Sequence, residues 1–141
     1  MADARLFTHE EAERTLPFVS RIVHDLMLEH PGWRRAVARY ELLAASARAD
    51  AREPAGLREA EREVAEHASR IDGFLDELAQ VGCVFKGFED GLVDFHAMHE
   101  GRVVCLCWRY GEPRIGHWHE LDAGFAGRQP WPDPSLTEIE S

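Results

Sequence analysis

Apolar and small side chains recur at every third or fourth position over residues 8–81, the first half of the chain. This spacing places them on one face of an α-helix and leaves most charged side chains on the opposite, solvated face. One run extends over residues 12–47 and a second over residues 57–81, with the turn sequence EPAG at 53–56 between them. Two amphipathic runs joined by a short turn predict an antiparallel helical hairpin.

Local signals mark the start and a break of the first helical run. Thr8 and Glu11 match the Thr-x-x-Glu capping box, in which both side chains accept hydrogen bonds from free amides of the first turn. Pro31 and Gly32 interrupt the run, because proline lacks an amide hydrogen and collides with the preceding turn. Since the apolar spacing continues past this point, we expect two roughly collinear helices.

After Gly82 the apolar period changes to two. Four segments rich in branched and aromatic residues follow, at 84–88, 92–97, 102–110 and 115–121, and turn residues separate them. These segments predict an antiparallel meander of three to four strands.

The predicted fold is therefore α+β, with a single domain over residues 1–128. The helical hairpin at 8–81 is expected to pack on the small sheet at 83–122, because it is the only layer that can cover an apolar sheet face. Residues 129–141 are rich in Pro, Asp, Ser and Glu, and we expect an extended or disordered tail there.

The strand register decides which side chains share a face of the sheet. A four-residue turn at 98–101 would place Asp94 opposite Cys105. A turn at 111–113 would place Cys105 opposite His119, and Cys107 opposite His117. The face away from the helices then collects Asp94, His96, Cys105, Cys107, Arg109, His117 and His119.

Thiolate, imidazole and carboxylate groups on one sheet face suit zinc or iron. His117 and His119 offer two imidazoles from one strand, and Cys105, Cys107 or Asp94 could supply a third ligand. Two other interpretations stay open. Strand cysteines are frequently small buried hydrophobic residues, and paired histidines frequently close hydrogen bonds at a polar or dimeric interface.

Charged groups next to these residues allow several roles. Glu120 and Asp122 could orient an imidazole, act as a general base or cap the following turn. Arg109 and Arg128 could clamp a carboxylate or phosphate group, and the simpler alternative for Arg109 is an ion pair with Glu112 or Asp94.

Composition narrows the class of partner. The net charge of −10 argues against a general nucleic-acid or anionic-membrane binder, since both reward clustered Lys and Arg. No apolar run approaches about 18 residues and no secretory leader pattern opens the chain, so we expect a cytoplasmic protein. Three cysteines, two of them separated by one residue, make a disulfide framework improbable and leave reduced thiols or metal ligation.

Four stretches resemble a known protein family. They are LFTHEEAERTLPFV at 6–19, GLVDFHA at 91–97, VCLCWRYGEP at 104–113 and HWHELDAGFAGRQP at 117–130. On these motifs the chain is similar to the prokaryotic family catalogued as domain of unknown function 2203. The resemblance covers most of the chain and implies a helical hairpin with a small sheet, without an established activity.

The resemblance also ranks the candidate residues. The family pattern allows other residue types at His117 and has proline at the position of His96. It therefore favours a site built from Asp94, Cys107, His119, Glu120 and Asp122 over one that depends on a pair of histidines.

Together these observations predict a small cytoplasmic homodimer that binds a metal ion, zinc or iron, or a small-molecule ligand on the outer sheet face. In a catalytic site, His119 with Asp94 or Cys107 would hold the metal. Glu120 would then act as acid and base, and Arg109 as an electrostatic clamp. The rival hypothesis is a non-catalytic interaction or dimerisation module, with a helical hairpin that pairs with a helical partner and a polar sheet face that forms an interface.

Overall fold

Helix α1 (His9–Asp50) begins directly after the capping box predicted from the sequence. The amide of Glu11 donates to Thr8 Oγ1 at 3.0 Å, and the amide of Thr8 donates to Glu11 Oε1 at 2.8 Å. The computed structural model describes residues 5–50 and 52–132, and α1 is the longest element in it.

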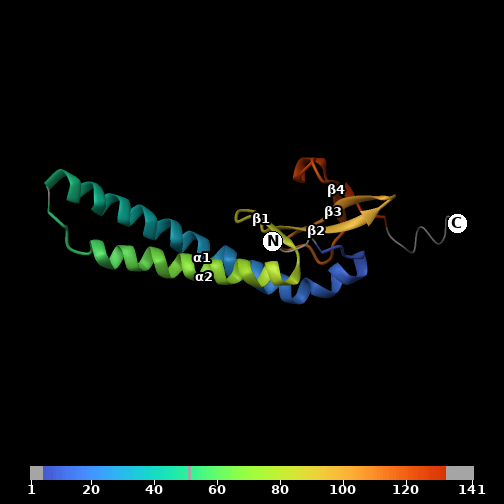
Figure 1. Ribbon diagram of the computed structural model, residues 1–141, viewed down its shortest axis with the longest axis horizontal. Coiled ribbons are helices and arrows are strands. Elements are labelled where there is room, and N and C mark those ends of the chain that lie inside the picture. Colours follow the sequence, from blue (N-terminus) through green and yellow to red (C-terminus); the bar gives the residue numbers. More distant parts are fainter. Residues whose placement is uncertain (1–4, 51, 133–141) are drawn as a thin grey trace.

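The first helical run is one helix, so the expectation of two collinear helices is wrong. α1 contains both Pro17 and Pro31 and continues through them over 42 residues. A proline removes one backbone hydrogen bond, whereas packing of an apolar face supplies most of the stability of a helix in a protein. Helix α2 (Leu57–Val81) packs along α1 (Figure 1), and ion pairs join the two helices before Pro31, at Glu29, and after it, at Arg39. This packing supports α1 across the proline.

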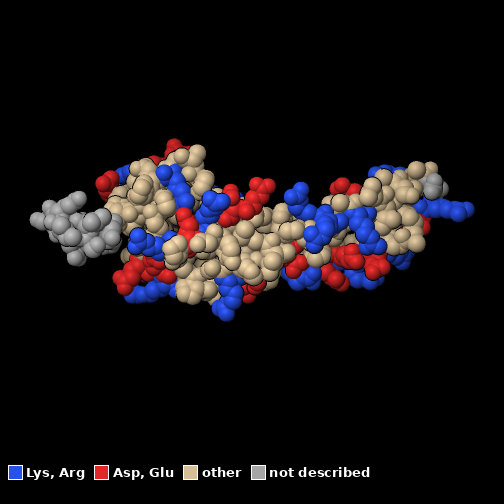
Figure 2. All heavy atoms as spheres, turned by 180° about the vertical axis from the view of Figure 1, so that it is seen from behind, with Lys and Arg blue, Asp and Glu red and all other residues tan. Residues whose placement is uncertain are grey.

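The two helices form the antiparallel hairpin that the apolar spacing predicted (Figure 1). One end of the hairpin lies under the sheet and the other projects well beyond it. Acidic and basic side chains lie interleaved along the hairpin on the face shown in Figure 2. Ion pairs link the two helices, as between Arg39 and Glu63 at 3.0 Å and between Arg70 and Glu29 at 2.8 Å. Neither α1 nor α2 has the length and apolar character needed to cross a membrane.

The sheet is antiparallel, and its strands follow one another in chain order. The strands are β1 (Val84–Gly87), β2 (Leu92–His99), β3 (Arg102–Arg109), β4 (His117–Glu120) and β5 (Gln129–Pro130). The α+β class is confirmed, and the five strands exceed the three to four expected.

The additional strand, β5, lies in the segment expected to form the tail. Its two residues pair with β4, and the amide of Trp131 donates to the carbonyl of Gly116 at 2.8 Å. Residues 133–141, the remainder of that segment, lie outside the described residues.

The turn between β2 and β3 is shorter than predicted, which corrects the register. His99 pairs with Arg102, and Asp94 lies opposite Cys107 instead of Cys105. The connection is a two-residue turn in which Glu100 has φ 52° and Gly101 has φ 79°, as in the type I′ turns favoured by twisted hairpins. A shift of two residues leaves every side chain on its predicted face, because the side-chain period of a strand is two.

The register between β3 and β4 is confirmed. Cys105 lies opposite His119, and Cys107 lies opposite His117. One face of the sheet packs on the hairpin and forms the core with Val93, Phe95, Ala97, Val104, Leu106, Trp108 and Trp118. The other face, called the outer face below, carries the polar set built around Asp94, Cys107 and His119.

Residues 121–131, called the C-terminal segment below, follow β4 and contain the short helix η1 (Phe125–Gly127) and β5. Figure 1 shows η1 on the side of the sheet away from the helices. Part of the C-terminal segment therefore lies on the same side of the sheet as the outer face and contacts β4.

Candidate metal site

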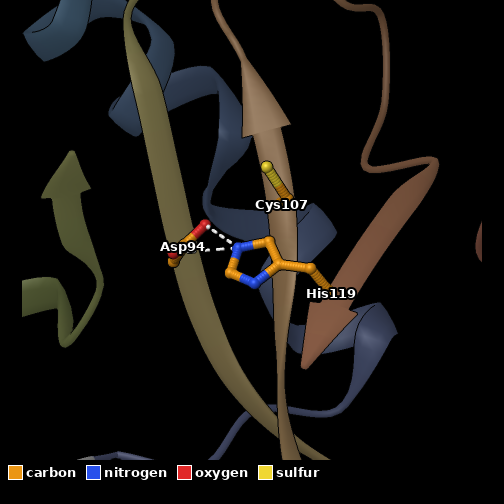
Figure 3. Close-up of side chains that lie close together, drawn as sticks. All are labelled: Asp94, Cys107 and His119. Carbon is orange, nitrogen blue, oxygen red and sulfur yellow. Dashed lines mark hydrogen bonds and ion pairs between the residues drawn. The ribbon is translucent and has the colours of Figure 1, made fainter. Parts of the chain in front are cut away.

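Three side chains from three neighbouring strands converge on the outer face. Asp94 comes from β2, Cys107 from β3 and His119 from β4, and one ligand atom of each lies within 4.8 Å of the others. All three residues are at most 2% exposed. Figure 3 shows the imidazole of His119 reaching across β3 toward Asp94, with the Cys107 side chain beside it.

The imidazole of His119 is oriented by a backbone carbonyl. Its Nδ1 lies 2.8 Å from the carbonyl oxygen of Glu120. A carbonyl oxygen can only accept, so Nδ1 carries a hydrogen and donates it. The other ring nitrogen, Nε2, then faces the carboxylate of Asp94, at 3.1 Å from Oδ1 and 3.2 Å from Oδ2. This arrangement, with one nitrogen held by a carbonyl and the other presented, is usual for histidines that bind a metal.

The thiol of Cys107 holds its proton at neutral pH. Burial raises the pKa of Cys107 to about 11, and the nearby Asp94 carboxylate adds to the effect. The charge and hydrogen bonding of Arg128 act in the opposite direction without overcoming it. A cysteine in this state becomes a thiolate when a metal ion displaces the proton.

The spacing of the three donors is close to that of a zinc site. Zinc bonds of about 2.0–2.3 Å in tetrahedral geometry separate neighbouring donor atoms by about 3.3–3.7 Å. The contacts of 3.1 Å and 3.2 Å between His119 and Asp94 are near that range, and the Cys107 sulfur lies within 4.8 Å of both partners. A small side-chain movement of Cys107 would complete a three-residue ligand set.

The remaining predicted ligands lie outside this cluster. Cys105 is buried opposite His119, and burial raises the pKa of its thiol to about 11. His117 lies opposite Cys107, with Nδ1 3.7 Å from Glu112 Oε2. Asp122 is exposed in the turn that follows β4.

The two predicted catalytic residues also point elsewhere. The Glu120 side chain accepts a hydrogen bond from Arg102 Nε at 2.9 Å on the surface. Its backbone carbonyl alone contacts the cluster, where it accepts from His119 Nδ1. Arg109 pairs with Asp90 at 3.3 Å, and half of its side chain is exposed.

Glu112 makes more contacts near the site than its place in the sequence indicates. Glu112 accepts hydrogen bonds from Arg128 Nη2 and from the amide of Arg109, the latter at 2.7 Å. Burial raises the pKa of Glu112, but these hydrogen bonds outweigh it and hold the pKa below its usual value. A carboxylate in a tight turn gives no local signal of a partner sixteen residues away, although Arg128 itself was a candidate clamp.

Comparison with known proteins identifies a family and no activity. Residues 5–131 match the family described as "Uncharacterized conserved protein (DUF2203)". This match covers most of the chain, so the chain belongs to that family. Neither a curated protein nor a solved structure matches the chain.

Proposed function

We propose that this member of the DUF2203 family binds a divalent transition-metal ion, zinc or iron(II), through Asp94, Cys107 and His119. The observation that carries the proposal is the convergence of three buried donor groups of different chemistry within 4.8 Å. Carboxylate, thiolate and imidazole together are a donor set suited to these ions.

Charge supports a divalent ion. The Asp94 carboxylate and a Cys107 thiolate together carry two negative charges, and neutral His119 adds none. A divalent ion therefore leaves the buried cluster neutral, which avoids the large cost of an uncompensated charge in the interior.

Burial favours a metal site over the rival interface hypothesis for this face. Asp94, Cys107 and His119 are covered within a single chain, so a partner could reach them only after the cover opened. With three protein ligands, a tetrahedral ion keeps a fourth position for water or a small-molecule ligand. The homodimer expected from the sequence stays a prediction, to be checked by sedimentation.

Metal analysis tests the proposal directly. Protein purified without chelator and dialysed against zinc, or anaerobically against iron(II), should retain close to one ion per chain by elemental analysis. The Cys107→Ala variant should lose this ion, whereas Cys83→Ala should keep it. Cys83 is a matched control because it is also a buried free cysteine, with its thiol donating to Leu78 O at 3.6 Å.

Two results would overturn the proposal. One is wild-type protein that retains neither metal and melts at the same temperature with and without both. The other is equal metal content in the Cys107→Ala and wild-type proteins.

A further inference from the structure

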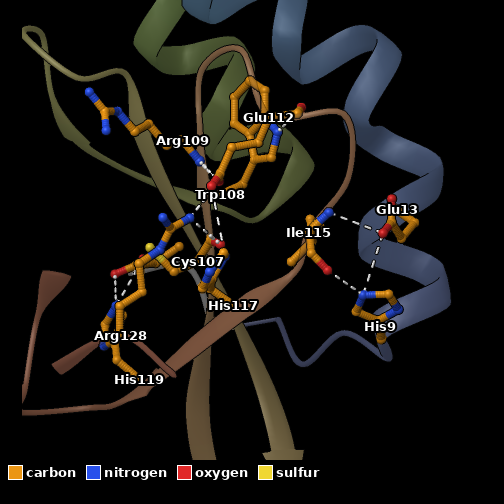
Figure 4. A network of polar contacts seen from close by, with 11 residues as sticks. His9, Glu13, Cys107, Trp108, Arg109, Glu112, Ile115, His117, His119 and Arg128 are labelled. Atoms are coloured by element: carbon orange, nitrogen blue, oxygen red, sulfur yellow. Dashed lines mark hydrogen bonds and ion pairs between the residues drawn. The ribbon is translucent and has the colours of Figure 1, made fainter. Parts of the chain in front are cut away.

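Arg128 contacts one of the candidate ligands, Cys107, and reaches it from the C-terminal segment. It directly precedes β5, and β4 lies between β5 and the strand that carries Cys107. Its Nη2 nevertheless donates to the carbonyl of Cys107 at 3.3 Å (Figure 4). The Arg128 side chain therefore crosses a neighbouring strand to contact the residue that supplies the sulfur ligand.

A carboxylate fixes this position of Arg128. The same Nη2 donates to Glu112 Oε1, and the guanidinium carbon lies 5.1 Å from the centre of the Phe125 ring. The Arg128 side chain is 13% exposed and that of Glu112 is 24% exposed, so the pair is shielded from water. Shielded ion pairs with hydrogen bonds are stronger than exposed ones.

The Nε of Arg128 takes no part in these hydrogen bonds. This atom is buried without a hydrogen-bond partner among the described residues. Buried donors without a partner are rare and call for a physical explanation. A Cys107 thiolate would be a strong acceptor beside this guanidinium, whereas the protonated thiol is a weak one.

We propose that Arg128 is a positioning residue that donates to the Cys107 sulfur when metal is bound, and so couples metal binding to docking of the C-terminal segment over the site. This inference rests on the proposed metal-binding function. Thermodynamic linkage makes the coupling reciprocal: metal stabilises the docked segment, and the docked segment strengthens metal binding. Glu112 holds the Arg128 guanidinium in place both for metal binding and for docking of the segment.

The coupling can be measured with cobalt(II) as a zinc substitute and with hydrogen exchange. The absorption band of cobalt bound to thiolate reports Cys107 ligation, and competition with a chelator gives the affinity. In wild-type protein, zinc should slow amide exchange in residues 121–131. Arg128→Gln should weaken metal binding by about 10- to 100-fold, as the loss of other outer-shell partners does, and abolish this slowing.

Two further variants separate positioning from simple loss of fold. Arg128→Lys keeps the positive charge and should restore part of the metal affinity. Glu112→Gln removes the carboxylate that holds the Arg128 guanidinium, and it should lower both the metal affinity and the zinc-dependent slowing of amide exchange. Arg39→Gln removes an arginine from the Arg39–Glu63 ion pair on the distant hairpin and should match wild type.

The outcomes distinguish failure of the metal site from failure of the coupling. A wild-type chain without the cobalt band refutes the metal site and the coupling together. A normal cobalt band, with equal affinity and equal protection in wild type and Arg128→Gln, refutes the coupling alone.

Discussion

His119 Nε2 lies 3.1 Å and 3.2 Å from the two carboxylate oxygens of Asp94, and both side chains are 3% exposed. Since Nδ1 is committed to the Glu120 carbonyl, a hydrogen between Nε2 and the carboxylate must satisfy both groups in the absence of metal. A metal ion would replace that hydrogen. The same two side chains therefore serve the stability of the apoprotein and the proposed ligation.

The first prediction concerns the stability of this pair without metal. In chelator, Asp94→Ala should lower the free energy of unfolding by about 3–5 kcal/mol, because it leaves a buried imidazole without its partner. Asp94→Asn should cost less, since the amide hydrogens can donate to Nε2 of a neutral imidazole. Urea unfolding of both variants measures the difference. Equal costs for the two would show that the hydrogen bond to His119 contributes little.

The second prediction compares two glycines with positive φ. An alanine Cβ at Gly91 (φ +66°) would stand 2.7 Å from Tyr110 Cβ and 2.8 Å from Met27 Sδ, whereas at Gly101 (φ +79°) no atom lies within 4 Å. Gly101→Ala should cost about 1–2 kcal/mol for the left-handed backbone alone. Gly91→Ala should cost about 1–3 kcal/mol more, because the added methyl group overpacks the contact between the sheet and α1. Urea unfolding should rank them in this order, and a reversed order would contradict the packing around Gly91.

The fold was predictable where local signals are unambiguous. The capping box at Thr8 and the two-residue period of the strands correctly gave the start of α1 and the two faces of the sheet. The sequence did not determine the cross-strand partner of Asp94. Hairpins with two-residue and four-residue turns differ by a register shift of two residues, and this shift keeps every side chain on the same face of the sheet. β5 escaped recognition because two residues, one of them proline, carry no periodic pattern.

The sequence predicts which residues share the outer face of the sheet, but not which of their side chains meet. The alternation along β2, β3 and β4 puts Asp94, Cys107 and His119 together on the outer face. This alternation does not show which side chains extend across a neighbouring strand and contact one another, as His119 contacts Asp94. Glu120 follows His119 directly on β4, so the strand alternation already turns its side chain to the opposite face, where the structure pairs it with Arg102.

The third prediction follows from the thiols. The pKa of each of Cys83, Cys105 and Cys107 is raised, mainly by burial, from 9.0 to about 11. In the unfolded chain the thiols lose their protons at lower pH than in the folded chain. Stability that is fully present below pH 9 should therefore decline between about pH 9 and pH 11.

Urea unfolding of reduced, metal-free protein at several alkaline pH values measures this decline. Cys83→Ala removes one of the three contributions and should show a shallower decline than wild type. An identical decline in the two proteins would assign it to other groups.

The fourth prediction combines the metal and the proton at Cys107. Zinc at about 100 times its dissociation constant should raise the free energy of unfolding by about 2.7 kcal/mol, because it binds the folded chain. At a fixed zinc concentration this gain should grow from about pH 6 to pH 8, since zinc must displace the thiol proton and the displacement is easier at lower proton concentration. Thermal melts with and without zinc measure the gain. Cys107→Ala should lose the gain and its pH dependence, and Cys83→Ala should keep both. A gain that is independent of pH in wild-type protein would show that zinc binds without the Cys107 thiolate.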